Sequence, residues 1–241
     1  MKESGSAAGR RKAAAAAAEP APARLALPAD RLSTKERILD AAEALFSERG
    51  YYGVSIRDIT RLAGVELALA NYHFGPKEEL FRQVFARRAE EHCAAFEAEI
   101  ERLWQDAGDR PPKPEAVIRA FCLPIFEKAS RAGPGWKAYV RLLARAAMSG
   151  RDQVFLHSLN ERYDPVVKRF IDALRRALPA ADERNIYYAF YFLQGALVYI
   201  LSEPGTIDRL SGGLCDSADY DALLERMVPF FAAGFYSLAG R

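Results

Sequence analysis

The sequence contains few of the side chains that most often form metal sites and disulfide frameworks. Its 241 residues include only three cysteines and three histidines. The cysteines are far apart and odd in number, so they predict neither a disulfide framework nor a CxxC zinc site. This usage is typical of a reducing compartment, and we expect the protein to be cytoplasmic. The residues concerned are Cys93, Cys122, Cys215, His73, His92 and His157.

The common catalytic motifs are also missing. The sequence has no HExxH zinc motif, no phosphate-binding loop and no GxSxG turn. His92 and Cys93 are adjacent, so a helix would point them to different faces and they would not readily share a metal ion. The acidic pairs at 78–79 and 90–91 are typical of solvated helix faces. We therefore expect no metal, no cofactor and no enzyme, and an enzyme is the least favoured alternative.

Only one stretch is long and uncharged enough to suggest a membrane span. Residues 185–202 carry no charge, and eighteen residues reach the length threshold of a transmembrane helix. The stretch nevertheless contains Asn185, Gln194 and four tyrosines, and it lacks basic residues on one flank. A helix that is apolar all round must be buried all round. We expect one face to pack inside its own domain and the other against a second subunit, with no membrane partner.

The N-terminus differs in composition from the rest of the chain. Arg10, Arg11 and Lys12 precede six alanines, and Glu and Pro follow where a secretion signal would have a long hydrophobic stretch. Residues 1–30 therefore read as a disordered, basic, Ala/Pro-rich tail. Residues 31–88 carry ten Lys and Arg against eight Asp and Glu, and the remainder carries nineteen against twenty-one. This weak polarity suits an N-terminal region that faces nucleic acid.

After residue 31, apolar residues recur with helical rather than alternating spacing. In Thr34–Arg49 they follow the i, i+3, i+4, i+7, i+8 pattern, with Ser33 or Thr34 as cap and Gly50 as stop. No strand pattern with turn signals occurs, so the fold class is all-α. Asp164–Pro165 is expected to kink or split its helix, and Pro229 is expected to kink the last helix. The helices are expected near residues 34–49, 55–63, 66–74, 77–104, 115–131, 135–149, 153–178, 182–203 and 219–238.

Residues 55–74 read as a helix, a turn at Gly64 and a second short helix. Two helices joined by a tight turn and supported by a third form the helix-turn-helix module, whose second helix enters the DNA major groove. Val65 and Ala70 are expected to face inward. Exposed Leu and Tyr beside Asn and His are unusual on a merely solvated helix, whereas they suit contact with thymine methyl groups and phosphates.

Three segments together resemble the DNA-binding domain of the TetR family. They are RILDAAEALFSERGY at 37–51, SIRDITRLAGV at 55–65 and NYHFGPKEEL at 71–80. The resemblance covers residues 33–88. It implies a three-helix DNA-binding domain at 31–88, followed by an all-helical ligand-binding and dimerisation domain at 89–241. It also implies a sequence-specific transcriptional regulator, by family habit a repressor. A helical interaction protein that does not bind an operator is the alternative.

The resemblance places the DNA contacts residue by residue. Leu67, Ala68 and Asn71 approach base edges, and Arg57 is the candidate for bidentate guanine recognition. This sequence has Leu-Ala-Leu where many relatives have a basic or small residue followed by threonine, which suggests more apolar contact with thymine methyl groups. Contacts mainly to phosphates are implied for Leu69, Tyr72, His73 and Lys77.

The resemblance also implies a homodimer that binds a palindromic operator. One short recognition helix gives little affinity, and two of them roughly 34–36 Å apart would read a palindrome on one face of the duplex. The last two long helices, at about 182–203 and 219–238, are implied to form a four-helix interface. Gly195 and Ala196 would permit close approach of helices.

Aromatic residues are frequent in the C-terminal part, and two interpretations remain open. They form an ordinary core, or some of them line a cavity for a small hydrophobic effector whose polar end is oriented by tyrosine hydroxyls or Gln194. Residues 66–75 look most like the branch of the family that includes fatty-acid-responsive regulators, which suggests an acyl-type effector. The candidate ligand-binding residues are Phe126, Trp136, Tyr139, Phe155, Phe170, Tyr187, Tyr191 and Gln194.

Overall fold

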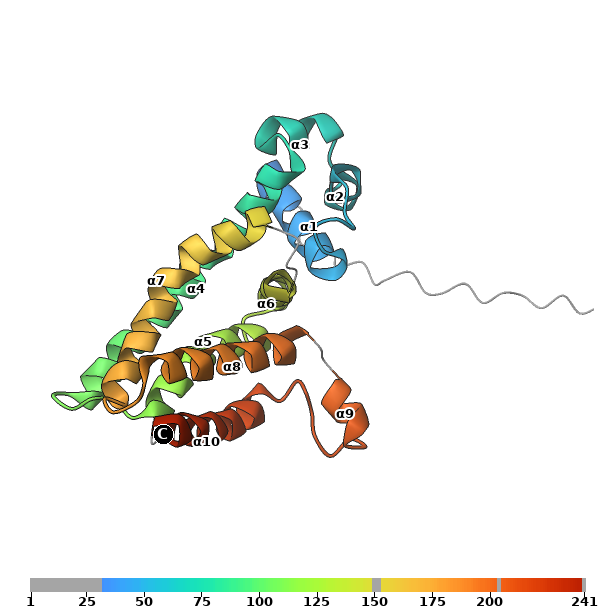
Figure 1. Cartoon of the computed structure of the whole chain (residues 1–241). Coiled ribbons are helices and arrows are strands. Elements are labelled where there is room, and N and C mark those ends of the chain that lie inside the picture. The colour runs from blue at the N-terminus through green and yellow to red at the C-terminus, as the bar shows by residue number, and fades with distance from the viewer. Residues whose placement is uncertain (1–31, 149–152, 203–204, 240–241) are drawn as a thin grey trace, which may run out of the picture. The chain divides into compact units, whose positions relative to one another are not determined.

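The computed structural model of the protein describes residues 32–148, 153–202 and 205–239, and every regular element in these ranges is a helix (Figure 1). The all-α prediction is therefore confirmed. The tail expected at residues 1–30 lies outside the described residues. The helices are α1 (Thr34–Arg49), α2 (Ile56–Ala63), α3 (Leu67–Phe74), α4 (Lys77–Ala107), α5 (Pro114–Ser130), α6 (Pro134–Met148), α7 (Gln153–Ala177), α8 (Glu183–Ser202), α9 (Thr206–Leu210) and α10 (Tyr220–Ala239).

Local capping sets the ends of the first helices. The Ser33 hydroxyl accepts a hydrogen bond from the backbone N–H of Glu36, whose carboxylate accepts one from the N–H of Ser33, and α1 starts there. Ser55 and Asp58 repeat this capping box at the start of α2, so Ser55 is the cap rather than the first helical residue. Gly64 ends α2 at φ 65°, a left-handed conformation that glycine adopts without a steric cost.

The core of the DNA-binding region extends beyond residue 88. Ile38, Phe46 and Ile59 are fully buried there, and they share one apolar cluster with Trp136 and Tyr139 of α6. Helix α6 packs against both α1 and α8. The first three helices are therefore attached to the C-terminal helices through α6 as well as through α4.

A buried ionic cluster joins α1 and α4 near this junction. The Glu43 carboxylate, only 3% exposed, accepts hydrogen bonds from the guanidinium groups of Arg87, at 2.6 Å, and of Arg88. Arg87 also donates to Asp40 at 2.6 Å. A Cβ added to Gly135, at the start of α6, would lie 2.2 Å from a guanidinium nitrogen of Arg88. A side chain at position 135 would therefore require this guanidinium to move away from its position beside Glu43.

A second, larger apolar core holds the C-terminal helices together. Helix α10 packs against α5 and α8, and α4 packs against α5 and α7. Helix α7 is not split at Asp164–Pro165, because buried Val166 and Phe170 hold it against its neighbours on the C-terminal side of the proline. Pro229 likewise lies within the single helix α10. Within the described ranges, none of the helices combines the length and the hydropathy that a bilayer crossing requires.

Candidate nucleic-acid interface

Helix α3 is anchored by two residues and leaves most of its surface in solvent. Ala70 and Phe74, four residues apart, are buried, so one side of the helix packs on the core. Phe74 is thus a packing residue, as expected from the sequence. Of the other side chains, Tyr72 is 83% exposed, Ala68, Leu69 and Asn71 are exposed, and Leu67 and His73 are half-buried. Apolar and polar groups therefore form one outward edge of α3.

Helix α2, which packs against α3, carries exposed cationic groups. Arg57 is exposed in the first turn of α2. Arg61 lies one turn further on, where it donates to Asp58 at 2.9 Å. Hydrogen bonds from the side chain and backbone of Ser55, followed by the charge of Arg61, lower the pKa of Asp58. Asp58 therefore stays ionised at neutral pH, and its carboxylate accepts hydrogen bonds from Ser55, the cap of α2, and from Arg61.

Two basic side chains position the helix-turn-helix from within. The Arg37 guanidinium donates to the carbonyl oxygens of Ala63, at 2.6 Å, and Gly64, at 2.9 Å, at the turn between α2 and α3. The Lys77 ammonium donates to the carbonyl oxygens of Tyr51, at 2.8 Å, and Val54, at 3.0 Å. It also lies 4.0 Å from the centre of the Tyr51 ring, close enough for a cation–π contact.

Local sequence patterns did not indicate these internal contacts. The sequence predicts that Lys77 mainly contacts phosphates, because it lies at the start of α4 and a helix N-terminus favours anions. The structure places its ammonium on the connection between α1 and α2, so Lys77 holds that connection in addition to any contact with DNA. A phosphate contact of Lys77 stays a prediction. Acceptors more than twenty residues away along the chain cannot be identified from local spacing.

The structure does not bring the eight candidate ligand residues into one cavity. Phe126 and Phe170 are buried in the C-terminal core, whereas Trp136 and Tyr139 belong to the core of the DNA-binding region. The side chain of Phe155 lies outside the described residues. The other three are exposed on α8, whose opposite face packs inside the subunit, and their contact with an effector stays a prediction. These three are Tyr187, Tyr191 and Gln194.

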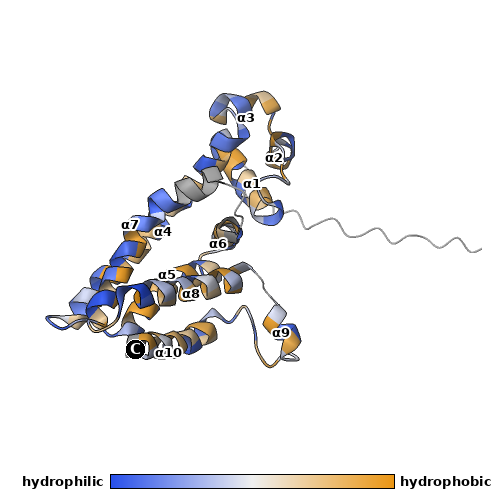
Figure 2. Ribbon diagram, in the orientation of Figure 1, coloured by the Kyte–Doolittle hydropathy of each residue, from blue (hydrophilic) through white to orange (hydrophobic). Residues whose placement is uncertain are grey.

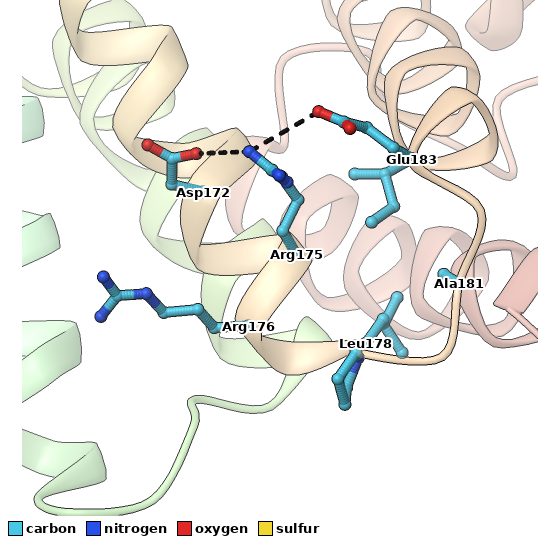
Figure 3. A pocket seen from close by; sticks show the side chains of 8 residues that line it. Asp172, Arg175, Arg176, Leu178, Ala181 and Glu183 are labelled. Carbon is cyan, nitrogen blue, oxygen red and sulfur yellow. Dashed lines mark hydrogen bonds and ion pairs between the residues drawn. The ribbon is translucent and has the colours of Figure 1, made fainter.

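A hollow of about 710 Å³ lies instead at the turn between α7 and α8 (Figure 3). Its polar groups include the Arg175 guanidinium, which lies 3.4 Å from Asp172 and 3.6 Å from Glu183. Its apolar groups come from the turn itself and from the first turns of α8. None of the seven candidate ligand residues whose side chains the structure describes lines it. The lining residues are Asp172, Arg175, Arg176, Leu178, Pro179, Ala181, Glu183 and Ile186.

A chain of three hydrogen-bonded side chains is buried near the junction of the two cores. Nδ1 of His92 lies 2.7 Å from the hydroxyl of Tyr163, which lies 2.7 Å from the hydroxyl of Tyr139. If Tyr139 donates to Tyr163 and Tyr163 donates to His92, both hydroxyl hydrogens are used, and only Nε2 of His92 has no partner among the described residues. The opposite direction would also leave the buried Tyr139 hydrogen without an acceptor there. We therefore assign Nδ1 as the acceptor.

Burial keeps all three groups neutral. Desolvation, reinforced by the charge of Lys128, lowers the pKa of His92 to about 3. Desolvation also raises the pKa of Tyr139 and of Tyr163. The three residues come from α4, α6 and α7, so these two hydrogen bonds link the three helices to one another.

Helices α8 and α10 carry a second exposed apolar surface, and Figure 2 shows hydrophobic residues along both helices. On α8 it is a row of aromatic side chains, each more than half exposed, within a segment that contains no charged residue from 185 to 202. Single exposed apolar residues are ordinary, whereas a continuous row marks an interaction surface. The row is Tyr187, Tyr188, Tyr191, Phe192 and Tyr199 on α8, with Phe230 and Tyr236 on α10.

Comparison with known proteins identifies both parts of the chain. Residues 38–84 match the family described as "Bacterial regulatory proteins, tetR family", and residues 119–234 match "Tetracyclin repressor-like, C-terminal domain". The biofilm operon icaADBC HTH-type negative transcriptional regulator IcaR of Staphylococcus epidermidis is 41% identical over 157 residues, which are 65% of this chain and 79% of that protein. The HTH-type transcriptional regulator AcrR of Shigella flexneri is 29% identical over 94 residues, 39% of this chain and 40% of that protein.

Solved structures share the fold at low sequence identity. The hemolysin II transcriptional regulator HlyIIR superposes with a TM-score of 0.56 at 18% identity, over 81% of this chain and 95% of that one. The transcriptional regulator FadR from Bacillus subtilis, in complex with stearoyl-CoA, superposes with a TM-score of 0.52 at 16% identity, over 83% of this chain and 98% of that one. These structures support the arrangement of an N-terminal helix-turn-helix domain and a C-terminal helical domain.

Proposed function

The chain belongs to the TetR family of bacterial regulatory proteins and is a DNA-binding transcriptional regulator, and we propose that it is a repressor that binds a palindromic operator as a homodimer. The exposed edge of α3 is the observation that carries the proposal. It presents Leu69 and Tyr72 to solvent, where neither contributes to the core. Because only Ala70 and Phe74 of α3 are fully buried, the outward side of the helix is available to a DNA groove.

We assign the contacts of this edge by the position of each side chain. Leu67, Ala68 and Asn71 approach base edges, where leucine and alanine suit thymine methyl groups and asparagine suits adenine. Arg57, on the neighbouring helix α2, is the candidate for bidentate recognition of guanine. The contacts to phosphates are assigned to Leu69, Tyr72, His73 and Lys77.

Pairing of two chains is assigned to the aromatic row on α8 and to the exposed residues of α10. Proteins of this family dimerise. The row carries no charge that would oppose burial, and its opposite face already packs in the C-terminal core. Two copies joined there would carry two recognition helices, and a two-fold axis between them matches the symmetry of a palindrome.

A small hydrophobic effector is assigned to the C-terminal domain. FadR from Bacillus subtilis was solved with stearoyl-CoA, and an acyl-type effector of this chain is proposed by analogy with it. Phe126 and Phe170 lie in the larger core and remain candidates to face such a molecule. The effector releases DNA only if it binds the free and the DNA-bound conformations with different affinity.

Selection of bound genomic DNA by the purified full chain tests the proposal. The expected result is an enriched inverted repeat, bound roughly a thousandfold or more tightly than a random duplex of equal length. Repeating the selection with long-chain acyl compounds tests the effector, because release of the enriched sites is then expected. Equal binding to all duplexes would overturn the proposal and favour a helical interaction protein.

A further inference from the structure

A short turn joins α2 to α3 (Figure 1), and Gly64 lies at its start with φ 65° and ψ 41°. The N–H of Gly64 donates to the carbonyl oxygens of Thr60 and Arg61, and the N–H of Val65 donates to that of Thr60 at 3.0 Å. Helix α3 begins soon after the glycine, at Leu67. The backbone dihedrals of Gly64 therefore contribute directly to the direction of α3 relative to α2.

Arg37 binds the carbonyl groups on both sides of this glycine. A single guanidinium nitrogen, Nη2, donates to the carbonyl oxygen of Ala63 at 2.6 Å and to that of Gly64 at 2.9 Å. The first carbonyl belongs to the peptide plane that precedes the Cα of Gly64, and the second belongs to the plane that follows it. The rotation of one plane relative to the other is determined by φ and ψ of Gly64. Two hydrogen bonds from one nitrogen therefore hold both dihedrals at their observed values.

The side chain that makes these bonds is itself firmly anchored. Arg37 lies on α1 directly before Ile38, whose side chain is fully buried in the core of the DNA-binding region. The guanidinium of an arginine stays protonated in proteins, so its donors are always present. The carbonyl groups that it binds lie at the C-terminal end of α2, where the helix dipole favours a cation. A Cβ on Gly64 would lie 3.0 Å from the same nitrogen, so the guanidinium lies directly against the turn.

Base recognition depends on the direction of α3 more strongly than attraction to phosphates does. Contacts to base edges require defined side-chain positions in the major groove, whereas attraction to phosphates depends on charge and not on sequence. A rotation of α3 would displace the base contacts assigned to Leu67, Ala68 and Asn71 and leave the charge of the domain unchanged. Such a rotation would therefore lower affinity for the operator more than affinity for random DNA.

We propose that Arg37 is a positioning residue that sets operator specificity by fixing the conformation of Gly64 and thereby the direction of α3. The proposal rests on the proposed operator binding and adds to it a determinant on α1, outside the two helices that contact DNA. Without the two hydrogen bonds, Gly64 samples the wide range of φ and ψ that is open to glycine. Helix α3 then presents its side chains in several orientations, and the operator loses its advantage over random DNA.

Arg37→Met and Lys35→Met form a matched pair of variants. Each removes one positive charge from the first turn of α1, and of the two side chains Arg37 is the one that donates to the α2–α3 turn. Lys35 is exposed, and its ammonium lies 5.9 Å from the centre of the Phe74 ring. Fluorescence anisotropy measures the ratio of the affinities for the enriched inverted repeat and for a random duplex of equal length.

We expect Arg37→Met to lower this affinity ratio about tenfold or more, which is the loss that one mismatched base pair causes. Lys35→Met should lower both affinities together and leave the ratio at the wild-type value. Arg37→Lys should restore most of the ratio, because an ammonium carries three hydrogens on one nitrogen and can donate to both carbonyl groups as Nη2 does. A ratio in Arg37→Lys as low as in Arg37→Met would overturn the proposal.

Gly64→Ala changes the same dihedrals while Arg37 stays in place. A Cβ is strained at φ 65° and would press on the guanidinium, so the turn must shift and the affinity ratio should fall. Gly108→Ala is the matched control, because Gly108 has φ 59° at the end of α4 and no atom lies within 4 Å of its added Cβ. An unchanged ratio in Gly64→Ala would overturn the proposal even if Arg37→Met did not fold.

Hydrogen exchange locates the change in the turn. The N–H of Val65 should exchange faster in Arg37→Met than in wild type, because its hydrogen bond to Thr60 depends on the conformation of Gly64. Unchanged exchange at Val65 would overturn the proposal. Equal losses of operator and random affinity in Arg37→Met would assign Arg37 to phosphate contact, and would overturn the proposal while leaving the proposed function standing. A wild-type chain that binds all duplexes equally would overturn both.

Discussion

The exposed faces of α3 and α8 both carry large apolar side chains, and the charges around each face indicate the kind of partner that suits it. Leu69 and Tyr72 are exposed on α3, and helix α2, which packs against α3, carries two exposed arginines, Arg57 and Arg61. On α8, the aromatic row lies in a segment without a single charge. Cations beside a short apolar edge suit a polyanion with a groove. A long uncharged face suits a second protein surface, because burying it leaves no ion unpaired.

The largest effect should come from a charge placed on the α8 face. Tyr191→Glu introduces a carboxylate into the aromatic row on α8, where two copies would meet in a low-dielectric interface in the proposed dimer. We expect the dimer to dissociate and operator affinity to fall by roughly a hundredfold or more, on the order of 3 kcal/mol. Sedimentation equilibrium and fluorescence anisotropy with operator DNA measure the two quantities.

The matched variant on α3 separates the two faces. Tyr72→Glu should weaken DNA binding while the dimer stays intact, because Tyr72 is exposed far from α8 along the chain. If Tyr191→Glu remained dimeric, or if Tyr72→Glu dissociated the dimer, the assignment of partners to the two faces would be wrong.

Acidification should lower the free energy of unfolding, because the buried His92 that links α4 to α6 and α7 is neutral in the folded protein. The folded-state pKa of His92 is about 3, because burial disfavours its charged form. Between the unfolded value of about 6.5 and this folded value, the unfolded chain binds more protons, so stability falls as pH falls. We expect His92 to cost about 2 kcal/mol of unfolding free energy between about pH 7 and pH 5.

Urea unfolding of wild type and His92→Gln at several pH values measures this contribution. Glutamine keeps an acceptor for the Tyr163 hydroxyl but does not titrate. The difference between the two chains should therefore change with pH below about 6.5 and stay constant above it. A difference independent of pH across this range would show that His92 is not held neutral by burial.

Lys77→Ala tests whether Lys77 stabilises the fold in addition to contacting DNA phosphates. Loss of two charge-assisted hydrogen bonds to Tyr51 and Val54 should lower the unfolding free energy by about 1.5 kcal/mol. Binding to operator and random DNA should weaken equally, with a smaller salt dependence. Calorimetry and salt titrations measure these effects, and Lys168→Ala, exposed on α7, is the control. An unchanged Tm would assign Lys77 to phosphate contact alone.

The smallest effect is expected at a single base pair. Arg57→Ala should lower operator affinity about tenfold and relax the preference at one position, because a bidentate guanine contact is lost. Arg61→Ala is the matched control, since Arg61 is exposed on the same helix but paired with Asp58. Titration against operators with single base changes measures the preference. The same preference in wild type and Arg57→Ala would rule out base reading by Arg57.

Local chemistry made most of the helices predictable. Ser33 with Glu36 and Gly50 mark both ends of α1, and their signals lie close to the helix ends. Helix α9 was not predicted, because its five residues have no buried face and therefore no apolar period to detect. The outward edge of α3 was predicted from its spacing around Ala70.

Local sequence patterns could not predict contacts between segments that are far apart in the chain. His92 and Tyr163 are 71 residues apart, and Arg37 reaches a turn 26 residues away. The exposure of Tyr187, Tyr191 and Gln194 could not be predicted from local patterns either. Composition places aromatic residues in the C-terminal half, but only the packing of α8 decides which of them face the interior and which face solvent.

If two chains pair through the uncharged row on α8, as proposed, the amount of this protein in the cell becomes a variable of its regulation. At concentrations below the dissociation constant most chains are single, and the dimers available to an operator increase with the square of the chain concentration. A modest change in synthesis rate would then produce a steeper change in gene expression. Unpaired chains would also expose this aromatic surface to other proteins, so pairing would lower their tendency to aggregate.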